Sequence, residues 1–157
     1  MESMAAIHRI SEDFYEETFT LVALHSSIED FTLVYTLNSW LKTKLKRSMN
    51  DLEIPQSGSF PIFDWRDEVN DRYFTLVSNN YVKEEELSIG NLFQDQPSFT
   101  KYHLIPEYRD VDYFLKIEHD ELDAEEEILK SILPIPKIIT AYLVDASKLK
   151  SKNNLIF

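Results

Sequence analysis

Apolar residues recur at every second position in several segments of the chain, and this alternation predicts β-strands. The segments cover residues 14–24, 60–65, 73–78, 101–105, 111–118 and 138–144. The last segment is apolar on both of its faces, so we expect a central strand there. Residues 101–105 and 111–118 lie on either side of a bend at 106–110, and we expect them to pair with each other.

Two other segments have apolar residues at the three-to-four-residue spacing of an amphipathic helix. In residues 28–48 this stripe consists of Phe31, Val34, Leu37, Leu41 and Leu45. A second helix is expected over residues 122–133, with an acidic first half and with prolines after its end. Residues 52–59, which contain Pro55 and Gly58, predict a loop. Residues 81–99 are ambiguous between a short helix and an irregular excursion.

The predicted order is strand, helix, several strands, helix and strand, which favours an antiparallel sheet with both helices packed on one face. We therefore expect an α+β two-layer sandwich, with a ferredoxin-like arrangement and extra strands as its topology. A chain of 157 residues is expected to form a single domain. Residues 1–11 are expected to be a flexible N-terminus, and residues 146–157 a basic and apolar C-terminal tail.

Composition and charge narrow the classes of function. The net charge of −12 disfavours binding to nucleic acid, which is a polyanion, and the absence of cysteine excludes thiolate nucleophiles and cysteine metal sites. The chain has two glycines and no pair of histidines at metal-binding spacing, so we expect no phosphate-cradling loop, no metal and no cofactor. No segment has the apolar length that a signal peptide or a membrane span needs, so we expect a cytoplasmic protein without membrane contact.

Acidic side chains that could take part in catalysis or binding are most concentrated at the bend that begins with Pro106. Proline cannot donate a ladder hydrogen bond, so strand pairing must break there. Glu107, Asp110 and Asp112 follow closely, and His103 could converge with Glu107 across the bend. Neighbouring carboxylates push their pKa values apart, so one hypothesis is acid/base chemistry with Glu107, Asp112 and His103 as catalytic candidates. We favour the alternative, in which these carboxylates accept backbone N–H groups or pair with a neighbouring arginine and fix the turn.

Several residues suggest contact surfaces. Trp40 lies beside the apolar stripe of the first helix and is expected to be half exposed, while Phe157 either folds back into the core or packs on a second copy. The end of the first helix carries a basic run of Lys42, Lys44, Lys46 and Arg47. This run is either a solvated surface or a docking site for an acidic protein or RNA. Asn38, if buried, needs a hydrogen-bond partner from the sheet or from a ligand.

The sequence of the bend also resembles the signature motif of a known family. Ile105-Pro106-Glu107 is followed, after three residues, by Val111-Asp112-Tyr113, and this spacing resembles the signature of the IPExxxVDY family. The resemblance implies a small cytosolic protein of Bacteroidetes-type bacteria, in a family without an assigned activity or cofactor. It also associates the chain with fatty-acid synthesis genes, which makes acyl carrier protein, an acidic protein, a candidate partner for the basic run.

We therefore interpret the chain as a non-enzymatic module that acts through protein contacts, with a homodimer as one form of such contact. The alternative is a small-molecule-binding protein or a weak acid/base enzyme that uses the carboxylates at the bend. This alternative requires Glu107 and Asp112 to open into a shared pocket rather than to bond to backbone groups.

Overall fold

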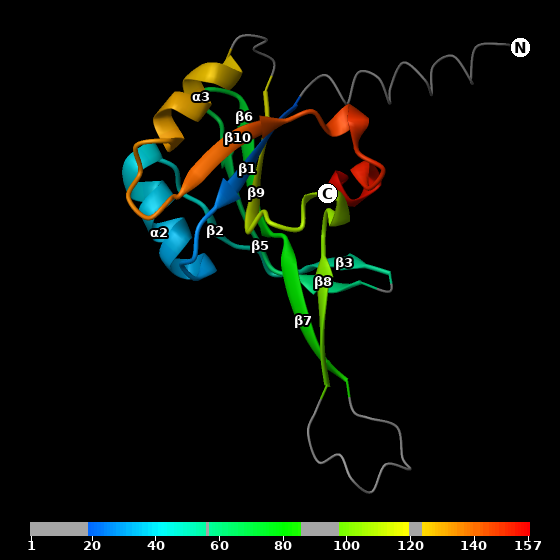
Figure 1. The fold of residues 1–157 in the computed structure, drawn as a ribbon. Helices are drawn as coiled ribbons and strands as arrows, with labels where there is room; N and C mark the ends of the chain where they lie inside the picture. Colours follow the sequence, from blue (N-terminus) through cyan, green and yellow to red (C-terminus); the bar gives the residue numbers. More distant parts are fainter. Residues whose placement is uncertain (1–18, 56, 86–97, 120–123) are drawn as a thin grey trace, which may run out of the picture.

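The computed structural model describes residues 19–55, 57–85, 98–119 and 124–157 (Figure 1). Four expectations fall at least partly on residues outside these ranges. They are the flexible segment 1–11, the beginning of the first strand, most of the ambiguous segment between residues 81 and 99, and the beginning of the second helix at residues 122 and 123.

The core of the fold is a six-stranded sheet in which every neighbouring pair of strands is antiparallel. Its spatial order is β10-β1-β9-β6-β5-β2. The strands are β1 (Phe19–His25), β2 (Lys46–Arg47), β5 (Ile62–Asp67), β6 (Arg72–Ser78), β9 (Tyr113–Glu118) and β10 (Thr140–Val144). The sequence pattern predicts two of the inner strands, β1 and β6, and the middle residues of both strands are buried on both faces.

Two helices, α2 (Asp30–Leu41) and α3 (Ala124–Ile132), cover one face of this sheet (Figure 1). Leu33 and Leu37 of α2 and Ile132 of α3 are fully buried there, in one cluster with alternate residues of the strands. The predicted α+β sandwich with both helices on one face is confirmed. The elements β1, α2, β6, β9, α3 and β10 follow the β-α-β-β-α-β order. The ferredoxin-like topology stays a prediction that this order supports.

The opposite face of the sheet packs against short elements rather than helices. They are the hairpin of β3 (Leu52–Ile54) and β4 (Gly58–Phe60) and three 3-10 turns, η1 (Pro106–Tyr108), η2 (Ala146–Lys148) and η3 (Lys152–Leu155). A second hairpin, of β7 (Asn80–Glu85) and β8 (Ser98–His103), extends away from the body of the molecule as an arm (Figure 1). Both faces of the central strands are therefore covered, which explains why the sequence is apolar on both.

The first helix ends at Leu41, and the prediction that it reaches residue 48 is wrong. Lys42 adopts the left-handed conformation (φ 58°, ψ 35°), which ends the helix. The Asn38 side chain then holds the departing chain: its Oδ1 accepts from the Leu45 N–H and the Thr43 hydroxyl, and its Nδ2 donates to the Leu45 carbonyl. Leu45 is buried as the stripe predicts, but from an extended segment, and Phe31 at the stripe's start is 64% exposed.

Two predictions about pairing are also wrong. Where a loop was expected over residues 52–59, β3 and β4 pair as a hairpin, and β8 pairs with β7 rather than with β9. β9 instead lies between β1 and β6. The difference is in burial: all residues of β9 except the last are buried in the body of the sheet, whereas β8 carries exposed Phe99 and Lys101 and belongs to the arm.

The expectation that residues 138–144 form a central strand is wrong as well. β10 lies at the edge of the sheet, with β1 on one side and no strand beyond it among the residues that the structure places. Its two faces are apolar because layers above and below cover them: Ala141 packs with the α2 and α3 side, and Val144 packs with the turns on the other. Apolar faces therefore do not require a neighbour on each edge.

Candidate functional site

The bend at residues 105–111 is held by a buried asparagine that the sequence analysis does not identify as a candidate. Asn79, which is fully buried, donates from Nδ2 to the carbonyls of Tyr108 (2.8 Å) and Val111 (2.9 Å). Its Oδ1 accepts from the Ile105 N–H at 2.8 Å. Because these three bonds satisfy backbone groups on both arms of the bend, Asn79 replaces the strand ladder that Pro106 interrupts.

Glu107 bonds to the C-terminal tail. Its carboxylate accepts from the Ser151 N–H at 3.0 Å and from the Ser151 hydroxyl. Burial by itself would raise the pKa of this carboxyl, but hydrogen bonds from Ser151 and from the Lys150 N–H outweigh it and hold the pKa below its usual range. Glu107 is thus an ionised clamp that joins η1 to the segment leading into η3.

Asp112 bonds in the other direction, to the end of β1. Its Oδ2 accepts from the Ser26 N–H at 2.9 Å, and its backbone N–H donates to the Leu24 carbonyl at 3.1 Å. The neighbouring Tyr113 hydroxyl donates to the Ile28 carbonyl at 2.7 Å, and burial raises the pKa of Tyr113 to about 12. The Val-Asp-Tyr half of the motif therefore fixes the turn between β1 and α2.

His103 ends β8, where it lies opposite Asn80. Burial, followed by the nearby charges of Lys101 and Arg109, lowers the pKa of its imidazole, and its Nδ1 is buried without a hydrogen-bond partner. Glu107, Asp112 and His103 each contact different parts of the chain. No group of three or more acidic or histidine side chains with metal-binding geometry is present among the described residues. This geometry favours the structural interpretation of the carboxylates.

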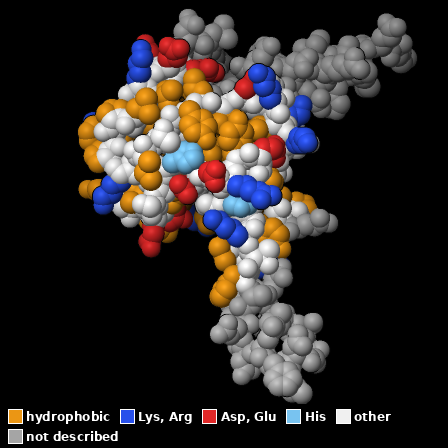
Figure 2. Space-filling model, viewed as in Figure 1, with side chains coloured by type: hydrophobic (Ala, Val, Ile, Leu, Met, Phe, Trp, Pro, Cys, Tyr) orange, Lys and Arg blue, Asp and Glu red, His pale blue; other side chains and the backbone are white. Residues whose placement is uncertain are grey.

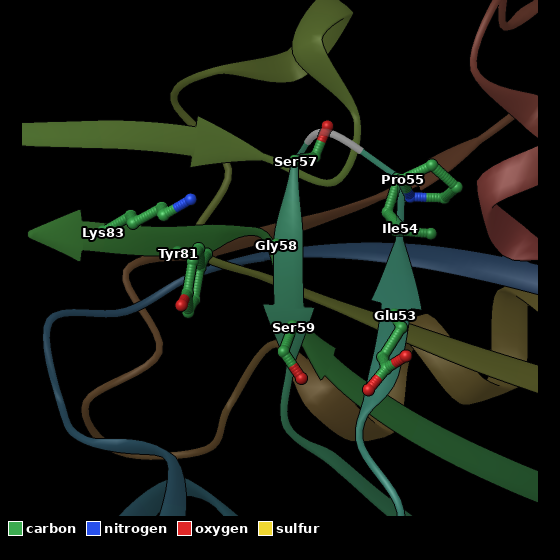
Figure 3. A pocket seen from close by; sticks show the side chains of 8 residues that line it. All are labelled: Glu53, Ile54, Pro55, Ser57, Gly58, Ser59, Tyr81 and Lys83. Carbon is green, nitrogen blue, oxygen red and sulfur yellow. The ribbon is translucent and has the colours of Figure 1, made fainter. Parts of the chain in front are cut away.

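A groove of about 480 Å³ lies between the β3–β4 hairpin and β7. Figure 3 shows the Tyr81 ring and Lys83 of β7 beside β4, with Glu53 and Ile54 of β3 beyond it. Gly58 makes this packing possible, because its φ of 117° is disfavoured for other residues and any Cβ there would overlap the Tyr81 ring. Glu107, Asp112 and His103 are not among the residues that line it.

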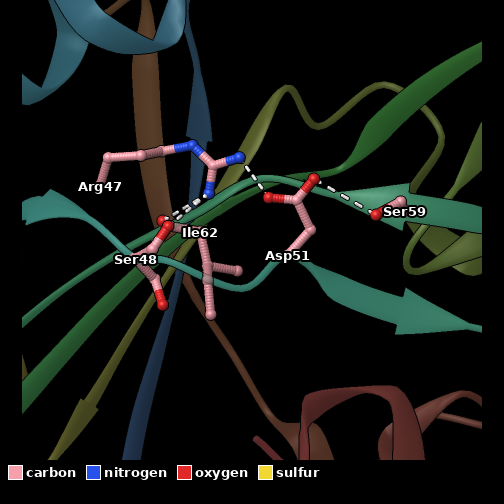
Figure 4. Close-up of polar contacts among 5 residues, drawn as sticks. All are labelled: Arg47, Ser48, Asp51, Ser59 and Ile62. Atoms are coloured by element: carbon pink, nitrogen blue, oxygen red, sulfur yellow. Dashed lines mark hydrogen bonds and ion pairs between the residues drawn. The ribbon is translucent and has the colours of Figure 1, made fainter.

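A second, polar hollow adjoins this groove and shares Glu53 and Ser59 with it. Figure 4 shows its main contacts, in which Arg47 pairs with Asp51, and Asp51 accepts a 3.3 Å hydrogen bond from the Ser59 hydroxyl. The Arg47 guanidinium also lies 5.9 Å from the centre of the Phe63 ring. Arg47 is therefore committed to contacts within the chain.

The other interaction candidates differ in how accessible they are. Trp40 is 51% exposed, as predicted, and Lys42, Lys44 and Lys46 are exposed. Phe157 folds back: its ring lies 4.7 Å from Nζ of Lys116, a lysine of β9 that is 1% exposed. This ammonium donates to the Leu155 carbonyl at 2.7 Å, and burial lowers its pKa. Phe157 and Lys116 together anchor the tail, and the pattern of the sequence indicated the fold-back as one of two options.

The two edges of the large sheet are different in kind. The β2 edge is two residues long, and both residues, Lys46 and Arg47, are exposed cations. The β10 edge runs through Thr140-Ala141-Tyr142-Leu143-Val144 and contains no charge and no proline, and Ile139 just before it is 74% exposed. Seen as in Figure 1, hydrophobic side chains gather over α3 and β10 (Figure 2). Short, charged edges resist pairing with another chain, and uncharged ones invite it.

The aromatic residues beside β10 form a polar margin to this edge. The Tyr142 hydroxyl lies 3.0 Å from Nε2 of His25, and the rings of Tyr142 and Tyr108 lie 6.4 Å apart. Burial, followed by Tyr108 and Asp110, raises the pKa of Tyr142. These contacts hold Tyr142 in place along the edge.

Comparison with models of known families, with curated proteins and with solved structures finds no match for this chain. Among the residues that the structure describes, no helix is both long enough and apolar enough to span a bilayer.

Proposed function

We propose that this chain is a non-enzymatic protein-interaction module, and that it binds a polypeptide along the open edge of β10. The observation that carries the proposal is the contrast between the two sheet edges. β2 is blunted by exposed cations, whereas β10 presents an uncharged edge next to the exposed Ile139.

The physical basis is strand addition. A strand at an edge leaves alternate backbone N–H and C=O groups without ladder partners, and an extended segment of another chain can pair with them. Main-chain hydrogen bonds then supply affinity, and side chains such as Ile139, Tyr142 and Leu143 supply selectivity. Tyr142 and Leu143 are already half-buried and ordered by packing, which reduces the entropy lost on binding.

A comparison of edge variants tests this proposal. Ile139→Lys adds a charge to the β10 edge, and Val69→Lys, at a site 92% exposed between β5 and β6, is the matched control. Both sites are exposed, so we expect both variants to fold. The tagged chain is mixed with the untagged chain and is used to recover the proteins that bind to it from cells. We expect the control to recover the same proteins as the unmodified chain and Ile139→Lys to lose at least one. Identical recovery by all three would contradict the proposal.

The Ile-Pro-Glu and Val-Asp-Tyr motif and the basic run support three more proposals. We propose membership of the IPExxxVDY family, a cytoplasmic location and an acidic partner such as acyl carrier protein for the exposed Lys42, Lys44 and Lys46. The support for that partner is electrostatic. These three exposed lysines occupy alternate positions and form a local positive surface on a protein whose net charge is negative, and such a surface attracts an acidic protein. Such docking should weaken as salt is raised, which titration at two ionic strengths would measure.

A second candidate function, small-molecule binding, is favoured by the groove beside β7. Its lining combines the Tyr81 ring with Lys83 and Glu53, an apolar surface with charges of both signs. A panel of metabolites can be screened by amide chemical shifts. Binding in this groove predicts shifts at Tyr81 and Lys83, and a panel that moves neither would contradict it.

A further inference from the structure

We propose that the polypeptide bound at the β10 edge is β10 of a second copy of this chain, in an antiparallel pair with its two-fold axis at Ala141. This inference rests on the proposed function and names its partner. A homodimer built in this way joins two six-stranded sheets into one continuous sheet, with the helices of both copies on the same side.

The centre at Ala141 follows from the pattern of side chains. In an antiparallel pair, residues directly opposite each other point to the same face of the sheet. Pairing about Ala141 places Ile139 opposite Leu143 of the second copy, and Thr140 opposite Tyr142. Ala141 and Leu143 pack with the cluster on the face that carries the helices, so the apolar side chains of the two copies meet there. The pair of Thr140 and Tyr142 meets on the other face.

The charges at the two ends of the strand favour the antiparallel direction. Lys137 precedes the strand and Asp145 follows it, and both are exposed. In an antiparallel pair the beginning of each strand approaches the end of the other, so unlike charges come closer at both ends. A parallel pair would bring like charges together at both ends, which is unfavourable.

The register does not depend on which residues direct their backbone groups outward. A two-fold axis that passes through one residue pairs even positions with even positions and odd with odd. Within β10 (Thr140–Val144) the outward N–H and C=O groups of one copy therefore meet those of the other in either case. The Ile139 N–H, just before the strand, donates to the His25 carbonyl at 2.8 Å and stays with β1. Shifting the register by one residue would place groups that already bond to β1 opposite groups that do not.

The net charge of the chain determines how self-association depends on salt. Two chains that each carry a charge of −12 repel each other, and α3, which packs against β10, carries the exposed Glu125, Glu126 and Glu127. Added salt screens this repulsion, so the self-association should become stronger as ionic strength rises. This is opposite to the behaviour expected for docking of an acidic partner on the basic run.

Cysteine pairing tests the register directly, because the chain contains no cysteine of its own. Ile139→Cys is made in a tagged chain and Leu143→Cys in an untagged one, and the two are mixed under mild oxidation. Opposite residues have Cα atoms about 4.5–5.5 Å apart, within reach of a disulfide. In each single variant alone, the two introduced thiols lie four residues apart along the strands, about 13 Å, which is too far. Thr140→Cys with Tyr142→Cys repeats the test on the other face, in case one variant folds poorly.

We expect a mixed disulfide dimer of tagged and untagged chains in the mixtures and little cross-linking in each single variant. A mixture that cross-links no more than the single variants would overturn self-pairing in this register. If that happens while Ile139→Lys still loses a different protein in the recovery experiment, the second copy is the wrong partner and the proposed function stands. If Ile139→Lys loses nothing either, both proposals fail.

Discussion

Single residues hold the Pro-Glu bend, and Asn79 has the largest part in it. Replacing Asn79 with Ala removes three hydrogen bonds and leaves an N–H and two carbonyl groups of the bend without them. The Tyr108 carbonyl still accepts from the Val111 N–H, so the Ile105 N–H and the Val111 carbonyl are the groups left unpaired. Each buried group left unpaired costs about 1–3 kcal/mol, so we expect a loss of about 2 kcal/mol or more in the free energy of unfolding. Urea titration measures it. The control is Asn80→Ala, because the neighbouring Asn80 Oδ1 has no hydrogen-bond partner; equal losses in the two variants would contradict this role.

The lowered pKa of Glu107 predicts that the free energy of unfolding depends on pH. Its native pKa is lowered, so the folded state prefers the ionised carboxylate more than the unfolded chain does. The resulting stabilisation is present above the unfolded pKa and is lost as pH falls through the native pKa. We expect Glu107→Gln to be less stable than the unmodified chain at about pH 7, and the difference to shrink as the pH falls to about 3, below the unfolded pKa. Urea midpoints at both pH values test this, and a difference that persists unchanged in acid would contradict it.

Residue roles were the part of the structure that the sequence predicted least well. The interpretation of Glu107 and Asp112 as acceptors of backbone N–H groups agrees with their contacts, although their distant partners, Ser151 and Ser26, could not be identified from spacing. Asn79 has no local signal at all, because the backbone groups that it bonds to lie 26 to 32 residues away. Such contacts depend on the tertiary fold and leave no periodicity in the sequence.

At the scale of elements, Gly58 permits β4 to pack against β7. Gly58→Ala should destabilise the chain by roughly 2–3 kcal/mol, because it adds backbone strain at φ 117° and a methyl group that overlaps the Tyr81 ring. In a Tyr81→Ala background the overlap disappears and only the strain remains. We therefore expect Gly58→Ala to cost less there than in the unmodified chain, as measured by a double-mutant cycle of unfolding free energies. Strictly additive effects would show that the two residues do not pack as described.

Element boundaries were predicted where local pattern and tertiary packing agree. β1 and β6 are examples, because their apolar residues face the layers above and below the sheet. The body of α2 is another, because its apolar residues face the sheet. The end of α2 was mispredicted because Leu45 continues the helical spacing while a left-handed Lys42 and the Asn38 side chain turn the chain away. The position of β10 in the sheet was mispredicted for a related reason. The pattern of apolar residues shows that both faces of the strand are covered, but it does not show whether another strand lies beside it.

In the whole molecule, the uncharged β10 edge is the surface that we propose pairs with a second copy. The protein is strongly acidic, and acidic chains tend to remain apart at low salt. Association through β10 must therefore come from main-chain pairing and from the apolar contacts of Ile139 and Leu143. A charge placed at Ile139 would be opposite Leu143 of the second copy and would lose its hydration there.

Sedimentation velocity over a range of concentrations, at low and at moderate salt, tests this claim most directly. We expect the unmodified chain and Val69→Lys to shift from monomer to dimer at the same concentration, and at lower concentration when salt is added. Ile139→Lys should need at least about tenfold more protein to dimerise, which corresponds to about 1.4 kcal/mol. Monomers at every concentration and salt, or a dimer that Ile139→Lys leaves unchanged, would contradict the account.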